Sequence, residues 1–277
     1  YKYNEPNNQT NKENLSLSKE KLQCKYYDET EFMKSIYNAQ MIDINNKQAD
    51  ATNQPTTAST YTIKGGIVPH HLLAGEMIAS FFKTISVEQP EIVVVIAPNH
   101  YGKGVKQVHT GSWSWQTPFG TLEAHRSIVN SLVESKIADT NFSLLEEDHS
   151  ISALVPYIKY YIPNSEIVPL LLHGSFGLKE AQKLGQNLQE KLEKENKKWL
   201  IIASVDFSHY LSLEQAEQMD EISIKAIENR DVNIIHHFNN DYMDSPPSII
   251  TLLSAMDAAG AVHMKVLDHS NSDIIAG

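Results

Sequence analysis

The stretch from Trp199 to Tyr210 reads WLIIASVDFSHY, and the rest of the chain is best interpreted outward from it. Its first five residues are apolar, which is typical of a short buried strand. Small and polar residues follow, and Asp206 and His209 stand three positions apart just past the apolar run. A carboxylate and an imidazole pack poorly in an apolar core, but they are common in binding and catalytic sites. The stretch therefore predicts a strand that delivers polar groups to a site.

Other short apolar runs along the chain alternate with segments of helical periodicity. Besides 199–203, strands are expected at 65–69, 91–96, 167–172 and 262–267. Helices are expected at 74–86, 122–134, 151–161 (with Ser150 as its N-cap), 178–194, 212–228, 231–238 and 248–259. This alternation predicts an α/β fold with a central, mostly parallel sheet flanked by helices on both faces.

Histidines follow the predicted strands within a few residues, and ligands of such sheets bind at the carboxyl ends of the strands. We therefore expect a polar site on one rim of the sheet that contains His70, His100, His173, His209 and His269. Asp206 and Asp268 stand beside two of these histidines, His209 and His269. A structural role is the favoured interpretation of His173, and His71 is interpreted as a packing or surface residue. Five other histidines are assigned to structure: His109, His125, His236, His237 and His263. The assignment of His125 rests on its place on the apolar face of a predicted helix.

Composition limits the classes of function. A chain of 277 residues with 41% hydrophobic residues can bury one large core. Its net charge of −11, without a basic cluster, argues against nucleic-acid binding. No apolar run approaches the ~20 residues that span a bilayer. Cys24 is the only cysteine, so an intrachain disulfide and a thiolate zinc cluster are both excluded.

The first 60 residues have a different texture from the rest. They are rich in Asn, Lys, Glu and Gln, and we interpret 1–60 as a largely disordered polar leader and linker without chemistry, with one short helix at 28–42. Residues 61–277 are expected to form the α/β domain. The chain begins at Tyr1 rather than Met, which slightly favours an extracytoplasmic protein whose signal or anchor was removed; an engineered start and a cytoplasmic location are the alternative.

Imidazoles and carboxylates converging without thiolates suit a non-haem divalent metal, with iron, copper and zinc as candidates. Two histidines and one carboxylate form the facial triad of non-haem Fe(II) oxygenases, and a zinc site with a bound water uses similar ligands. The chain has no G-x-S-x-G motif for a serine nucleophile. It also has neither a G-x-G-x-x-G motif nor a P-loop, which argues against a nucleotide cofactor.

Five further motifs follow one another along the chain: VPHHLLAG at 68–75, APNH at 97–100, EDHS at 147–150, DFSHY at 206–210 and NS at 271–272. In these motifs and in their order, over about residues 64–276, the chain resembles the Memo family, whose bacterial and archaeal members are known as AmmeMemoRadiSam system protein B. The resemblance implies a fold similar to class III extradiol ring-cleavage dioxygenases, and a functional link to an AMMECR-type protein and a radical-SAM protein. Family members usually continue past the position of Gly277 into a final strand, which we expect to be missing here.

The resemblance also implies roles for single residues. His70 and His100 match the family's metal-binding histidines, whereas His149, Asp206 and His209 match pocket residues and are predicted to be catalytic. The family's third metal ligand is commonly a cysteine, and Asp244 occupies that position here. A carboxylate in place of a thiolate shifts the preference from Cu(I) towards Fe(II), Mn(II) or Zn(II). We therefore expect Fe(II) to be favoured, with copper or zinc as alternatives.

Several functions agree with this site. The first is a metal-dependent, dioxygenase-like oxidoreductase acting on a small molecule. The second is an iron- or copper-binding protein without turnover, and the third is a module that recognises a peptide or partner protein through the same rim. A zinc-dependent hydrolase is the fourth. Because one fold hosts many chemistries, the resemblance does not choose among them.

Overall fold

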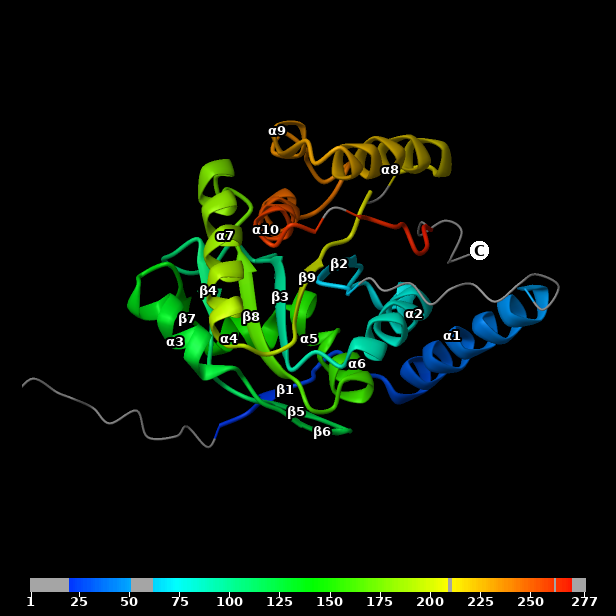
Figure 1. Cartoon of the computed structure of the whole chain (residues 1–277), viewed down its shortest axis with the longest axis horizontal. Helices are drawn as coiled ribbons and strands as arrows, with labels where there is room; N and C mark the ends of the chain where they lie inside the picture. The colour runs from blue at the N-terminus through cyan, green and yellow to red at the C-terminus, as the bar shows by residue number, and fades with distance from the viewer. Residues whose placement is uncertain (1–19, 51–61, 209–210, 262, 271–277) are drawn as a thin grey trace, which may run out of the picture.

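The computed structural model describes residues 20–50, 62–208, 211–261 and 263–270, and all statements on structure refer to these (Figure 1). Their centre is a six-stranded sheet in the order β2-β9-β3-β8-β4-β7. Neighbouring strands are parallel except for β4 and β8. The bounds are β2 Gly65–Val68, β3 Ile92–Pro98, β4 Val108–Thr110, β7 Asp139–Thr140, β8 Glu166–Leu172 and β9 Trp199–Ser204. The expected mostly parallel sheet is thus confirmed.

Alternate side chains of the central strands enter two separate cores, because successive residues of a strand point to opposite faces. Along β3, Val94 packs in one core and Val95 in the other, and both are fully buried. Helices on one face are α3 Arg126–Glu134, α7 Leu178–Lys194, α8 Leu213–Glu228, α9 Val232–Ile235 and α10 Pro246–Ala258. Those on the other are α1 Glu29–Asp50, α2 Gly75–Ile85, α4 Phe142–Glu147, α5 His149–Ser152 and α6 Val155–Tyr161. Helices therefore cover both faces, as expected.

The second face also carries a small sheet in the order β1-β5-β6, formed by β1 Leu22–Gln23, β5 Trp115–Thr117 and β6 Gly120–Leu122. The short helix expected at 28–42 is present and extends to Asp50 as α1. Leu22, Phe32 and Ile36 are buried in the second core. The described part of the first 60 residues therefore packs onto the sheet. None of the described helices combines the length and apolar character that crossing a bilayer requires.

Two helix starts differ from the expected ones. The helix expected from 122 begins at Arg126, because residues 120–122 pair in β6. His125 does not lie on the apolar face of that helix but caps it, and its ring accepts a hydrogen bond from the Ile128 amide. The helix expected at 151–161 is divided into α5 and α6, and Asp148 rather than Ser150 is the N-cap of α5.

The strand expected at 262–267 is wrong for the part of it that is described, since residues 263–267 belong to no strand. The chain leaves α10 through Gly260, which has a φ of 69°, and the Ala261 carbonyl accepts a hydrogen bond from Arg230. Further along, the His269 ring bonds to Asp220 of α8 at 2.9 Å. These contacts direct the segment along the helices rather than into the sheet.

Helices α7 and α10 approach each other closely at Gly185, where an added Cβ would collide with the backbone of Thr251 and Ala255. Gly185→Ala is therefore expected to destabilise the protein by about 1–3 kcal/mol, the usual cost of overpacking. Urea unfolding measures this. Gly174→Ala is the matched control, because no atom lies within 4 Å of the added Cβ at that position. Equal stability of the two variants would contradict the close approach.

Candidate metal centre

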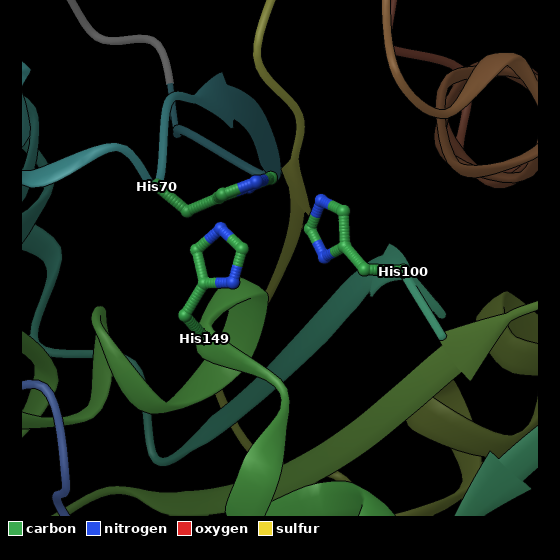
Figure 2. Close-up of side chains that lie close together, drawn as sticks. All are labelled: His70, His100 and His149. Atoms are coloured by element: carbon green, nitrogen blue, oxygen red, sulfur yellow. The ribbon is translucent and has the colours of Figure 1, made fainter. Parts of the chain in front are cut away.

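The site lies where three adjacent strands end. His70 follows β2, Asp206 follows β9 and His100 follows β3, and these strands are neighbours in the order β2-β9-β3. Asp244 reaches the same place from the turn before α10, where its amide donates to the Asp206 carbonyl at 3.1 Å. His149 is the first residue of α5. Figure 2 shows that the three imidazoles converge.

His70 is fully buried and presents its Nε2 to two carboxylates. Its Nδ1 lies 3.1 Å from the Ser204 hydroxyl, which donates its only proton to the Ser150 carbonyl at 2.5 Å. Ser204 therefore accepts the Nδ1 proton of His70, and the neutral imidazole keeps a lone pair on Nε2. That Nε2 is 3.2 Å from Asp244 Oδ2 and 3.4 Å from Asp206 Oδ2.

Asp148 orients His100 so that its Nε2, like that of His70, faces Asp244. Its Nδ1 donates to Asp148 Oδ1 at 2.9 Å, and its backbone amide donates to Asp148 Oδ2 at 2.9 Å. The side chain of Asp148 is fully buried and also accepts hydrogen bonds from the amide and hydroxyl of Ser150. The remaining Nε2 of His100 lies 3.6 Å from Asp244 Oδ2. A second imidazole lone pair is therefore directed at the same carboxylate.

Acceptor atoms thus face one another at the centre of the site. His70 Nε2 and both carboxylate oxygens of Asp244 are buried, and none of these three atoms has a hydrogen-bond partner among the described residues. Such an arrangement is unfavourable unless a proton or a cation lies between the acceptors. The residues therefore fit a divalent cation bound by imidazole and carboxylate.

Two sets of side chains are close enough to hold a metal ion, and both include His70. One set joins His70 to His100 and His149, and the other joins it to Asp206 and Asp244; within each set the candidate ligand atoms lie within 4.8 Å of one another. The imidazoles of His100 and His149 are stacked, with ring centroids 4.4 Å apart and an interplanar angle of 16°. His149 meets His70 edge-on at 5.1 Å.

The pKa values of the histidines also indicate that, without a metal, the site favours positive charge. Burial by itself lowers the pKa of His100, but the hydrogen bond to Asp148 and the nearby carboxylate of Asp244 outweigh it and raise that pKa to about 10. The pKa of His70 is raised as well, because Asp244 and Asp206 outweigh its burial. Burial and the neighbouring histidines lower the pKa of His149. Protons on His70 and His100 therefore take the place of a cation when no metal is bound.

The raised pKa of His100 predicts how the stability of the metal-free protein depends on pH. A histidine whose pKa is higher in the folded than in the unfolded chain stabilises the fold fully below its ordinary pKa of 6.5. This contribution is lost as the pH rises from 6.5 to about 10. Urea unfolding in the presence of a chelator should show the decrease. His100→Gln should show a smaller one, and equal decreases in both proteins would contradict the prediction.

Other predicted rim residues do not join the cluster. His71 is exposed and its Nδ1 accepts from the Leu73 amide, while His173 bonds to Ser175. His269 is held by Asp220, and Asp268 is exposed. His209 lies outside the described residues, so its predicted role stays a prediction. Two residues with a part in the site were not assigned one from the sequence, Ser204 and Asp148. The EDHS motif contains Asp148, but only the fold shows that it contacts His100.

Comparison with known proteins shows which family the chain is similar to. The family model of Memo-like proteins matches residues 32–277, so the match begins earlier than residue 64, where the motifs begin. A MEMO1 family protein of Pyrobaculum aerophilum is 28% identical over 77% of this chain and 78% of its own length. One of Methanothermobacter thermautotrophicus is 29% identical over 80% and 83%. A solved structure of an uncharacterized Escherichia coli K12 protein has a TM-score of 0.45 and 14% identity, covering 66% of this chain and 81% of that one.

Fold and site together define an α/β protein with a histidine–carboxylate cluster at the carboxyl ends of its central strands. The match to the family model extends over most of the chain. The chain belongs to the Memo-like family.

Proposed function

We propose that this protein is a metal-dependent oxidoreductase of the dioxygenase-like type that acts on a small molecule. Its metal is held by His70, His100 and Asp244. The observation that carries the proposal is the convergence of two imidazole Nε2 atoms on one buried carboxylate, at 3.2 and 3.6 Å from the same oxygen. Two histidines and one carboxylate with open positions are the ligands of non-haem Fe(II) oxygenases.

The ligand set also favours one metal. Asp244 contributes hard oxygen ligands, which suit Fe(II), Mn(II) or Zn(II) better than Cu(I). Cys24 cannot supply a thiolate instead, because burial raises the pKa of its thiol to about 12, and its side chain packs against the second core. We therefore favour Fe(II). When bound, it supplies one-electron chemistry and positions left open for reactants.

The surrounding residues would support such chemistry in distinct ways. His149 has a lowered pKa, so its imidazole is neutral near pH 7 and can accept a proton from a substrate hydroxyl. Asp206 accepts a hydrogen bond from the His70 amide at 2.9 Å and so holds the turn that carries His70. Ser204 and Asp148 fix the tautomers of His70 and His100 respectively, as groups around a metal site commonly do. His209, three residues after Asp206, completes the predicted catalytic set.

The test is metal analysis of protein purified without oxygen, followed by oxygen uptake in the presence of catechols. Wild-type protein is expected to contain iron near one equivalent, and His100→Ala is expected to lose it. His173→Ala is the matched control, because that residue follows the adjacent strand β8 but bonds to Ser175. Zinc bound through His100, with hydrolase activity indifferent to oxygen, would replace this proposal with a zinc hydrolase. Bound iron or copper without turnover would indicate a metal carrier, and no metal even after reconstitution would leave a partner-binding module.

A further inference from the structure

A short N-terminal segment, residues 21–27, lies against the junction between α4 and α5, directly beside the metal centre. Its strand β1 pairs with β5, and Leu22 is fully buried. The Gln23 amide donates to the Glu146 carboxylate at 3.1 Å, and Lys25 forms an ion pair with Glu146 at 2.8 Å. This segment lies before residue 32, where the match to the Memo-like family model begins.

Tyr26 is the residue of this segment that reaches the site. Its hydroxyl donates to the Glu147 carbonyl at 2.5 Å, and Tyr101 donates to the same carbonyl at 3.3 Å. Glu147 is the last residue of α4, where carbonyls lack helical partners, and His149 follows two residues later. The hydroxyl of Tyr26 therefore holds the backbone that carries His149.

The ring of Tyr26 also contacts the ring of His149, with centroids 5.7 Å apart and an interplanar angle of 58°. The same imidazole is stacked on His100 at 4.4 Å and meets His70 edge-on. Within the described part of the chain, we find no hydrogen bond from the His149 ring nitrogens. Contacts with the rings of Tyr26, His70 and His100 thus take the place of the hydrogen bonds by which Ser204 and Asp148 hold His70 and His100.

We propose that Tyr26 is a positioning residue for His149. Its hydroxyl fixes the Glu147 carbonyl, and its ring keeps the His149 imidazole stacked on His100. The part of this inference that concerns catalysis rests on the proposed function, in which His149 accepts a proton. The contact itself does not depend on that function. On this proposal, residues 21–27 contribute to the site.

Two variants separate the parts played by hydroxyl and ring. Tyr26→Phe removes the bond to the Glu147 carbonyl and keeps the ring, whereas Tyr26→Ala removes both. Tyr37→Ala is the matched control, because Tyr37 lies on α1 in the same N-terminal region and is 61% exposed. The first readout is the ring signals of His149 in the NMR spectrum of ¹⁵N-histidine-labelled full chain with Zn(II) added as a diamagnetic probe. His149→Gln assigns these signals.

Tyr26→Ala is expected to broaden or split the His149 signals and to lower kcat for oxygen uptake by about tenfold, with metal content unchanged, as for groups that orient a site residue. Tyr26→Phe should restore a single set of His149 signals and most of the activity. Unchanged His149 signals in Tyr26→Ala would overturn the inference, even if the melting temperature fell. If wild-type protein shows neither metal nor oxygen uptake, the proposed function fails, while the His149 signals still decide the role of Tyr26.

Discussion

Asp244→Ala is expected to lower the affinity for Fe(II) by about 100-fold or more. The reason is that Asp244 Oδ2 lies between the Nε2 atoms of His70 and His100, at 3.2 and 3.6 Å, and brings the negative charge that a divalent cation needs there. Loss of groups that merely orient ligands already costs about 10–100-fold, so loss of a ligand should cost at least as much. Competition titration against a chromophoric chelator under anaerobic conditions measures the affinity.

A second substitution at Asp244 tests the chemistry of the position rather than its presence. Asp244→Cys is expected to regain metal binding but to prefer soft metals, Cu(I) above all, because a thiolate replaces a carboxylate. Asp241→Ala is the control, since Asp241 belongs to the same turn but is exposed and bonds to Asn239. Unchanged metal content and affinity in Asp244→Ala would show that the metal is held elsewhere, and Asp206 would then be the next carboxylate to replace.

Asp148→Ala is expected to have the largest effect on stability, lowering the free energy of unfolding by about 3 kcal/mol or more. Its side chain is fully buried, caps α5 and accepts hydrogen bonds from the amide and ring of His100 and from Ser150. In the alanine variant, His100 and Ser150 both lose the acceptor of their hydrogen bonds. Burial on its own raises the pKa of Asp148, but bonds from His100 and Ser150 lower it overall. The stabilisation from these hydrogen bonds is therefore fully present above the ordinary pKa of an aspartate, and it is lost as the pH falls below that pKa.

Asp148→Asn separates the fold from the metal centre. The amide keeps the size of the side chain and loses its charge, so the stability should fall less than in the alanine variant. Metal affinity should still fall about tenfold, because His100 loses the carboxylate that fixes its tautomer. Asp231→Ala is the control for loss of a cap alone, since Asp231 caps α9 by accepting from the Ile234 amide. It should cost about 1 kcal/mol and leave metal binding unchanged. Equal losses of stability in Asp148→Ala and Asp231→Ala would contradict the role of the buried carboxylate.

Local patterns predicted most of the sheet and its covering helices. The run at Trp199–Ala203 forms β9, and Leu178–Lys194 has the same bounds as α7. Both signals are local, because apolar periodicity reports which face of an element is buried. The strand expected at 262–267 failed for the same reason. A short apolar run does not indicate whether a strand edge is free to pair with it. Residues 263–267 instead lie between two contacts, that of Ala261 with Arg230 and that of His269 with α8.

In the candidate site, too, some features were predictable from the sequence and others depended on tertiary contacts. The sequence by itself placed His70 and His100 at strand ends, and the family resemblance placed Asp244 at the third position. Strand ends alone did not separate His100 from His173, which follow the adjacent strands β3 and β8. Which of them faces the site depends on the neighbouring side chains: Asp148 holds His100 towards Asp244, whereas His173 turns to Ser175.

What the sequence determined, then, is the class of fold, the residue types of the site and the family. The tertiary structure decided which of those residues meet, because the order β2-β9-β3 joins strand ends that are more than 100 positions apart in the chain, such as His70 and Asp206. It also decided which atoms face the centre, since Ser204 and Asp148 determine the nitrogen that each imidazole presents. The contact between Tyr26 and His149 belongs to the same category. Pairings of this kind depend on packing between distant segments, on which local periodicity carries no information.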